Sequence, residues 1–210
     1  METQRLALRP LEEQDVAELY ALVYADGRVR EAWSGYAGTL HAFRLRFSSD
    51  PVWHAEDGLG FLAVVRKAEG RLLGLMGFQR YEPDEDTSHM RFEDPADEVG
   101  RDPALVEVEL TYALGRAYWG QGYATEAGRA LIELGFRRLG IDRIVNSVLV
   151  HPDHRSLALI ERLGFRVVGN LNPPVIAEGP FAGSPGAIGI LTRVAWEAGQ
   201  VGERNAACRL

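Results

Sequence analysis

The chain has 210 residues, 46% of them hydrophobic and 25% charged, a composition typical of a compact domain that buries a substantial core. Its 23 basic and 30 acidic side chains give a net charge of −7. Binding of nucleic acid through bulk electrostatics is therefore not expected, although a local basic pocket for one phosphorylated small molecule remains open. The single cysteine, Cys208, excludes a disulfide framework and a cysteine-rich zinc site, and we predict no metal.

The first half of the chain predicts a strand at 6–9, a helix from Glu12, a helix at 37–48, and a β-hairpin formed by 59–65 and 72–78. The strand ends at Pro10, whose nitrogen cannot donate to a ladder. From Glu12 onward, apolar residues recur at spacings of three and four, which is typical of an amphipathic helix.

A long acidic segment follows at 82–102, where nine acidic residues stand against two arginines. Loops beyond about 12–15 residues are usually functional or disordered. The segment is therefore either a solvated acidic insertion or an acidic lip that attracts a cationic substrate.

The second half predicts a strand at 105–114, a glycine-rich turn, a helix ending at Gly140, a strand at 144–150, a helix at 156–163, and strands at 165–168 and 188–194. This alternation of strands and helices predicts a mixed α/β sheet. No linker divides it, so we expect one domain over 1–197. The polar tail 198–210 is expected to be disordered or to reach the partner subunit of a homodimer.

The glycine-rich turn contains Gly120 and Gly122 between a strand and a helix. Glycines let a ligand approach the main chain, and the first N–H groups of a helix have no internal partner, so the turn predicts a pyrophosphate cradle. The spacing alone also fits an ordinary structural turn. Thr125 stands where the dinucleotide fingerprint needs a third glycine, and no Gly-Lys-Ser/Thr loop is present, so another phosphate-bearing cofactor is required.

Four separated motifs resemble those of the GNAT N-acetyltransferases, in the branch that acetylates the N-termini of ribosomal proteins. They are the opening segment 5–10, Glu109 with Tyr112, the turn 119–124, and Ser156 with 161–165, in the order in which the family has them. The resemblance implies an α/β fold with a mixed, mostly antiparallel central sheet flanked by helices. It also implies acetyl-CoA as the acetyl donor.

The resemblance further implies which residues hold the donor: turn amides for the pyrophosphate, and the preceding strand for the pantetheine arm. These residues are Tyr112, Ala113, Leu114, Trp119, Gly120, Gln121, Gly122, Tyr123, Ala124, Thr125, Asp153 and Ser156. Two positions depart from the family. Asp153 replaces the usual Asn and brings negative charge towards an anionic cofactor. Ile160 stands where many relatives carry the Tyr that protonates the leaving thiolate, so that acid cannot be carried over.

Glu109 is the first candidate for the catalytic base. It shares a strand face with Glu107 and Thr111, and two neighbouring carboxylates repel each other, which makes one of them a better proton acceptor. The alternative is an ordinary exposed strand carboxylate. Ser156 is a catalytic candidate that could hydrogen-bond the sulfur, or it is a helix cap. His151 and His154 are either acids or solvated loop residues.

We therefore predict a cytoplasmic, acetyl-CoA-dependent N-acetyltransferase, because the charged N-terminal segment is not a secretory signal and no apolar stretch would span a membrane. The acceptor is a protein N-terminus or a small cationic amine, attacked directly. The rival is an inactive CoA-binding sensor or assembly module, and a different acyl-CoA donor also remains open. Of the aromatic residues Trp33, Tyr36, Phe43 and Trp53, at most one or two are expected to contact the acceptor.

Overall fold

The computed structural model describes residues 1–32, 38–50, 58–81, 104–149, 155–168 and 186–207. The predictions that lie outside these residues concern the acidic segment 82–102 and Trp33, Tyr36, Trp53, His151, Asp153 and His154. Among the described helices, none combines the length and the apolar character that crossing a bilayer requires.

In the described part of the chain, seven strands form one sheet in the order β1-β2-β3-β4-β5-β7-β6. The strands are β1 Leu6–Pro10, β2 Gly60–Arg66, β3 Arg71–Arg80, β4 Glu107–Leu114, β5 Arg143–Leu149, β6 Arg166–Val168 and β7 Gly186–Thr192. All neighbouring pairs are antiparallel except β4 and β5. The predicted mixed, mostly antiparallel sheet is confirmed.

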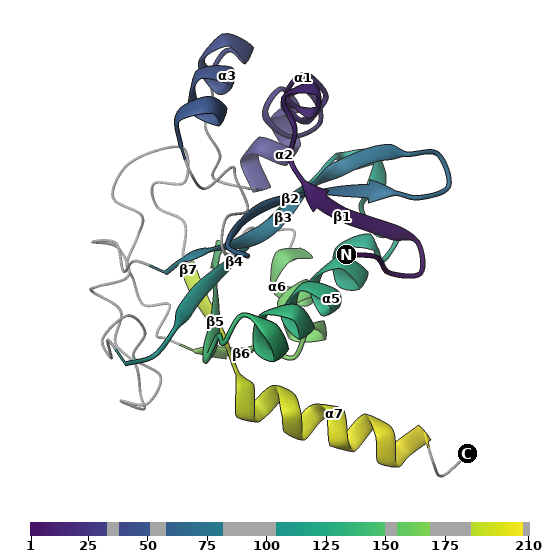
Figure 1. Ribbon diagram of the computed structural model, residues 1–210, viewed down its shortest axis with the longest axis vertical. Coiled ribbons are helices and arrows are strands. Elements are labelled where there is room, and N and C mark those ends of the chain that lie inside the picture. The colour runs from purple at the N-terminus through teal and green to yellow at the C-terminus, as the bar shows by residue number, and fades with distance from the viewer. Residues whose placement is uncertain (33–37, 51–57, 82–103, 150–154, 169–185, 208–210) are drawn as a thin grey trace.

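Helices cover both faces of this sheet (Figure 1). The helices are α1 Val16–Leu19, α2 Gly27–Ala32, α3 Leu40–Ser49, α5 Tyr123–Arg138, α6 Arg155–Arg162 and α7 Arg193–Ala207, with single-turn pieces at Glu13–Asp15, Tyr20–Tyr24 and Arg116–Tyr118. Helix α5 ends next to Gly140, whose φ of 68° matches the left-handed cap expected there.

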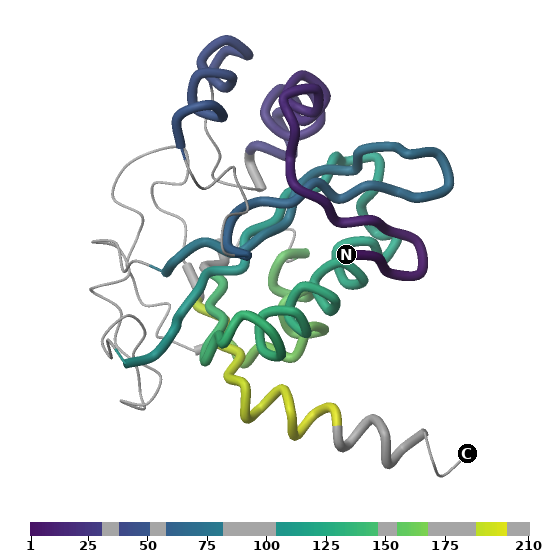
Figure 2. The backbone as a smooth tube through the Cα atoms, viewed as in Figure 1, coloured from purple at the N-terminus to yellow at the C-terminus, as the bar shows by residue number. Residues whose placement is uncertain are grey.

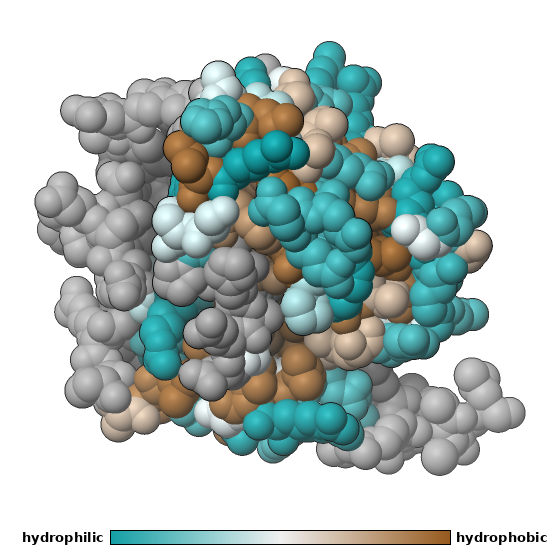
Figure 3. All heavy atoms as spheres, turned by 45° about the horizontal axis from the view of Figure 1, so that its top comes forward, coloured by the Kyte–Doolittle hydropathy of each residue, from teal (hydrophilic) through white to brown (hydrophobic). Residues whose placement is uncertain are grey.

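The strands contribute side chains to two cores, one on each face of the sheet, because successive side chains of a strand point to opposite faces. Val64 and Met76 pack towards α5 and α6, whereas their strand neighbours Ala63 and Leu75 pack towards the N-terminal helices. In the view of Figure 3, hydrophilic residues cover most of the described surface, and hydrophobic residues show in separate patches between them.

The parallel strands β4 and β5 separate early. Their ladder covers only three pairs, from Glu107–Arg143 to Glu109–Val145, although β4 continues to Leu114. At the point of separation the buried Asn146 donates its side-chain N–H to the carbonyl of Leu110. The last residues of β4 thus keep one edge free of β5, beside the turn that leads into α5.

Helix α7 is the main difference from the expected elements. The sequence favours a strand up to Val194, but β7 ends at Thr192, whose hydroxyl accepts a hydrogen bond from the N–H of Ala195 and starts a helix. Val194 is consequently 76% exposed, and Trp196 packs against Phe136 of α5. The helix then runs away from the body of the molecule, through part of the predicted tail (Figures 1 and 2).

Candidate active site

The glycine-rich turn connects the end of β4 to the start of α5. Gly120 has a φ of 71° and Gly122 a φ of 79°, which are left-handed conformations that favour glycine. A Cβ at Gly120 would meet no atom within 4 Å, and one at Gly122 would meet only Arg5 Nη2, at 3.4 Å. A side chain at Gly122 would therefore approach the guanidinium of Arg5.

The main-chain N–H groups of this turn are available to donate hydrogen bonds to a ligand. The first intrahelical bond of α5 runs from Glu126 N to the carbonyl of Gly122, at 3.0 Å. Across the part of the chain that the structure describes, the N–H groups of residues 120–125 donate to no protein atom. The N-terminus of α5 thus presents several free donors and the positive end of the helix dipole to one space, which is an anion site.

Hydrogen bonds from side chains to main-chain carbonyl groups fix the outer side of the turn. The indole N–H of Trp119 donates to the carbonyl of Leu114 at 2.7 Å, and the amide of Gln121 donates to the carbonyl of Ala117 at 2.7 Å. The guanidinium of Arg5 donates to the carbonyl of Gln121 at 3.0 Å. These bonds fix the turn without using its free N–H groups.

A cleft of about 1360 Å³ opens in front of the turn, lined by residues of β4, α5, α6 and the N-terminal segment. Among the described residues that line it are five arginines, Arg5, Arg116, Arg129, Arg155 and Arg162, and three glutamates, Glu2, Glu126 and Glu133. In a chain with a net charge of −7, this excess of arginine is the local basic pocket that an anionic ligand needs. The free donors, the positive charge and the open space fit the diphosphate of acetyl-CoA.

Two hydroxyl groups meet inside the cleft. Tyr112 Oη on β4 and Ser156 Oγ on α6 lie 2.5 Å apart, within hydrogen-bond distance. Burial raises the pKa of Tyr112 to about 12, although the hydrogen bond with Ser156 opposes this. The tyrosine is therefore protonated throughout the physiological pH range and keeps a hydroxyl group that can share a hydrogen bond with Ser156.

This pairing is a feature that the sequence-based reasoning missed. The motif places Tyr112 only on the strand that would hold the cofactor arm, and nothing in the sequence connects it with Ser156. The one available signal was the period of two, which puts Tyr112 on the same face as Val108 and Leu110, towards the helices. Ile160, which occupies the expected tyrosine position, is fully buried in the core.

Glu109 lies on the other face of β4 and does not line the cleft. It is half-buried, and Oε2 accepts a hydrogen bond of 3.1 Å from the side-chain amide of Gln79, which also donates to Thr111 Oγ1. Glu107, on the same face, forms a buried ion pair with Arg143. The charge of Glu107 is thus matched by Arg143, so the repulsion between carboxylates expected from the sequence loses its source.

The remaining predicted site residues occupy varied positions. Ala113, Leu114, Trp119, Ala124 and Thr125 line the cleft. Tyr123 also lines it but is buried at the start of α5. Phe43 is fully buried, and its ring centroid lies 4.5 Å from that of Tyr24, so it belongs to the core and not to an acceptor contact.

The fold and the site together define an α/β protein with an anion site where a strand turns into a helix. Comparison with known proteins identifies the family. Residues 5–166 match the Acetyltransferase (GNAT) domain, and the chain therefore belongs to the GNAT acetyltransferases.

The chain is also similar to individual proteins along most of its length. The Bacillus subtilis protein YkkB is 25% identical over 182 residues, which cover 82% of this chain and 90% of YkkB. Spermidine N-acetyltransferase from Vibrio cholerae, solved with CoA and spermine, superposes with a TM-score of 0.66 at 15% identity, covering 92% of this chain and 99% of that one. RimL, a ribosomal alpha-N-protein acetyltransferase solved with coenzyme A, superposes with a TM-score of 0.67 at 18% identity, covering 90% and 95%. These two structures share the fold of the chain.

Proposed function

We propose that the protein transfers the acetyl group of acetyl-CoA to a primary amine, by direct attack of the amine nitrogen. The observation that carries this proposal is the set of free N–H groups at residues 120–125, which open onto an arginine-lined cleft that also contains the Tyr112–Ser156 pair. An anion site and a proton donor in one cleft suit a donor that has a diphosphate at one end and a thioester at the other.

The residues that would hold the donor follow from this geometry. The main-chain amides of Gln121 to Thr125 would bind the diphosphate. The edge of β4 at Tyr112, Ala113 and Leu114, which β5 leaves free, would pair with the extended arm as an added strand does. Acetyl-CoA supplies the acetyl group as a thioester with a thiolate leaving group.

Proton transfer would be divided between the two faces of β4. Glu109 Oε1 or Oε2 would accept the proton of the acceptor nitrogen on the face away from the cleft, while Gln79 orients the carboxylate. On the cleft side, Ser156 Oγ would donate its proton to the departing thiolate of coenzyme A. Tyr112 Oη, which is hydrogen-bonded to Ser156, would return a proton to Ser156 and regain its own from water. The strand thereby separates the group that removes a proton from the group that supplies one.

The acceptor class that we favour is a small cationic amine or a protein N-terminus. A net charge of −7 attracts cations over the whole molecule, and the two structural neighbours named above act on a polyamine and on a ribosomal protein. The test is release of free thiol from acetyl-CoA, measured with polyamines, aminoglycosides, and peptides with free N-termini. Turnover with one class and none with the others would assign the acceptor.

A second candidate, a CoA-binding module without transferase activity, is favoured by Ile160. Its buried aliphatic side chain supplies no hydroxyl at the expected position on α6. The same assay separates the two: tight binding of coenzyme A without thiol release from any amine would support the module and contradict the transferase.

A further inference from the structure

Arg5 connects the N-terminal segment to the glycine-rich turn and to the first turn of α5. Its main-chain N–H donates to Glu126 Oε1 at 2.7 Å, and its Nε donates to Glu126 Oε2 at 2.6 Å. Its Nη1 donates to the carbonyl of Gln121 at 3.0 Å, and its guanidinium carbon lies 4.5 Å above the ring of Tyr123. One side chain thus contacts three successive parts of the cradle.

The bond to Gln121 sets the direction of a peptide group. In a trans peptide the carbonyl and the following N–H point in opposite directions, and the structure contains no cis peptide in its described part. Because Arg5 holds the carbonyl of Gln121 on its own side, the N–H of Gly122 is turned away from Arg5. That N–H is one of the free donors of the cradle.

The hydrogen bonds from Arg5 to Glu126 offset the repulsion between this carboxylate and a bound diphosphate. A carboxylate in the first turn of α5 would repel a diphosphate bound at the same helix end. Burial alone raises the pKa of Glu126, but hydrogen bonds from Thr3 and from the main chain and side chain of Arg5 lower it below the usual value, so the group is charged at neutral pH. The guanidinium of Arg5 matches this charge at contact distance.

We propose that Arg5 is a positioning residue for the donor diphosphate: it orients the Gln121–Gly122 peptide and neutralises Glu126, so that the start of α5 accepts an anion. The inference rests on the proposed binding of coenzyme A. Arg5 itself remains 43% exposed at the rim of the cleft. Figure 2 shows the N-terminal segment lying alongside α5, which is the arrangement that this role requires.

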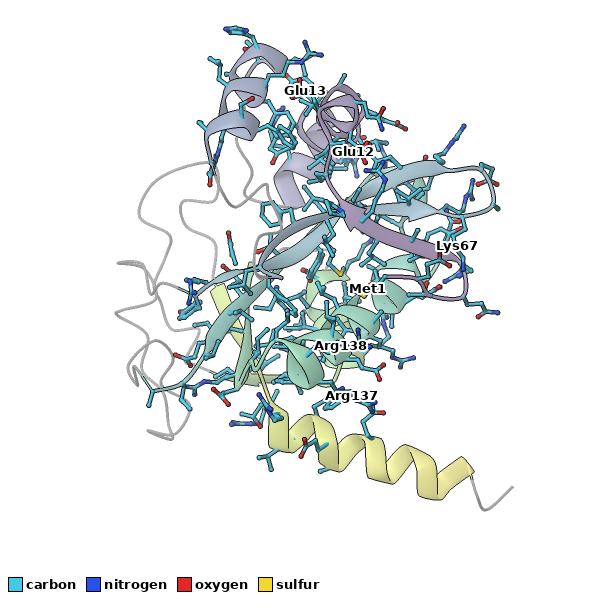
Figure 4. The ribbon with its side chains drawn as sticks, viewed as in Figure 1. Met1, Glu12, Glu13, Lys67, Arg137 and Arg138 are labelled. Atoms are coloured by element: carbon cyan, nitrogen blue, oxygen red, sulfur yellow. The ribbon has the colours of Figure 1, made fainter. Side chains whose placement is uncertain are left out.

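The first experiment compares coenzyme A with pantetheine, which lacks the diphosphate together with the 3′-phosphoadenosine attached to it. Coenzyme A affinity is measured by calorimetry for Arg5→Gln, Arg5→Lys and the matched control Arg138→Gln, and pantetheine affinity by NMR titration. Arg138 is exposed at the other end of α5 and loses the same charge (Figure 4). We expect Arg5→Gln to weaken coenzyme A binding roughly 10- to 100-fold, the range expected for losing charge-assisted hydrogen bonds. Pantetheine affinity and the control should change little. Arg5→Lys should be intermediate, because one ammonium group cannot serve Glu126 and Gln121 together.

A second experiment tests the role of Glu126. If Arg5 acts partly by neutralising this carboxylate, the loss caused by Arg5→Gln should shrink by about threefold or more when Glu126→Gln is already present. Thermal melting of each variant shows that it is folded. The proposal is overturned if folded Arg5→Gln binds coenzyme A as wild type does, or if it loses pantetheine affinity equally. A wild-type protein that binds no coenzyme A would instead contradict the proposed function.

Discussion

The two faces of the sheet are built in different ways. On the cleft face, α5 runs for 16 residues and buries one continuous side against the sheet. On the opposite face, helical pieces of four, five, six and ten residues follow one another at Val16–Leu19, Tyr20–Tyr24, Gly27–Ala32 and Leu40–Ser49. One face is covered mainly by one long helix, with α6 beside it, and the other by several short helical pieces.

This difference suits the two halves of an acyl transfer. The proposed donor site must hold one invariant diphosphate, and main-chain N–H groups at the start of a long helix supply donors of constant chemistry for it. The opposite face carries Glu109. Substitutions in the short helices on that face can occur without disturbing the proposed donor site. We therefore expect substitutions at the start of α5 to affect donor binding, and those on the face with short helices to affect turnover or stability.

The largest expected effect is on the cleft face, in Gly122→Asp. The new carboxylate would lie beside Arg5 at the start of α5, compete with Glu126 for its guanidinium and repel a diphosphate bound there, so coenzyme A affinity should fall about 100-fold or more. Gly140→Asp is the matched control, since Gly140 has a φ of 68° with no atom within 4 Å of its Cβ position and lies outside the cleft. Both variants bear the cost of a left-handed aspartate, so equal losses of affinity in calorimetry would contradict the placement of the cradle.

On the opposite face, Glu109→Gln tests the base. Removing a general base lowers turnover by roughly 10²-fold or more, so kcat at neutral pH should fall by about that factor while coenzyme A affinity stays unchanged. Gln79→Ala should give a smaller loss, because it removes only the amide that orients the carboxylate. Wild-type turnover in Glu109→Gln would make Glu109 a structural residue.

Tyr112→Phe is a substitution on the cleft face, and we expect it to lower kcat less than Glu109→Gln does. Loss of the hydroxyl beside Ser156 should lower kcat about tenfold, with KM for acetyl-CoA little changed. Because the pKa of Tyr112 is about 12, the wild-type enzyme should show no loss of activity from this group below about pH 11. Tyr20→Phe, on the other face, is the control, and equal kcat values for the two variants would remove Tyr112 from the proton path.

The turn and the long helix of the cleft face were largely predictable from the sequence, because their signals are local. Gly120 and Gly122 stand next to the helix that they begin, and Gly140 marks its end. The strands of the sheet could likewise be predicted from continuous apolar runs. The exception is the end of β7, where Thr192 starts a helix although Val194 has strand character.

What the sequence could not supply are contacts between distant segments. Arg5 and Glu126 are 121 residues apart, and Tyr112 and Ser156 are 44 apart. No periodicity relates such pairs, since they meet only through the folded sheet. For the same reason the ion pair of Glu107 with Arg143 could not be foreseen, and the sequence suggested a repulsion with Glu109 instead.

The smallest expected effect concerns the stability of the face with short helices. Arg9 donates two hydrogen bonds, of 2.6 and 2.7 Å, to the buried carboxylate of Asp15. Burial alone raises the pKa of Asp15, but the bonds from Arg9 and from the N–H of Glu12 lower it below the usual value. A lowered pKa means that the stabilisation is present above the unfolded value of about 3.9 and is lost as the pH falls through the folded one.

Asp15→Asn should therefore lower the free energy of unfolding at pH 7 by about 1–2 kcal/mol, and this difference should narrow below about pH 4. Urea denaturation across that range measures it, with the exposed Glu18→Gln as control. If the free energies of unfolding of wild type and Asp15→Asn differ by the same amount from pH 7 to pH 3, ionisation of Asp15 in its pair with Arg9 does not contribute to the pH dependence of stability.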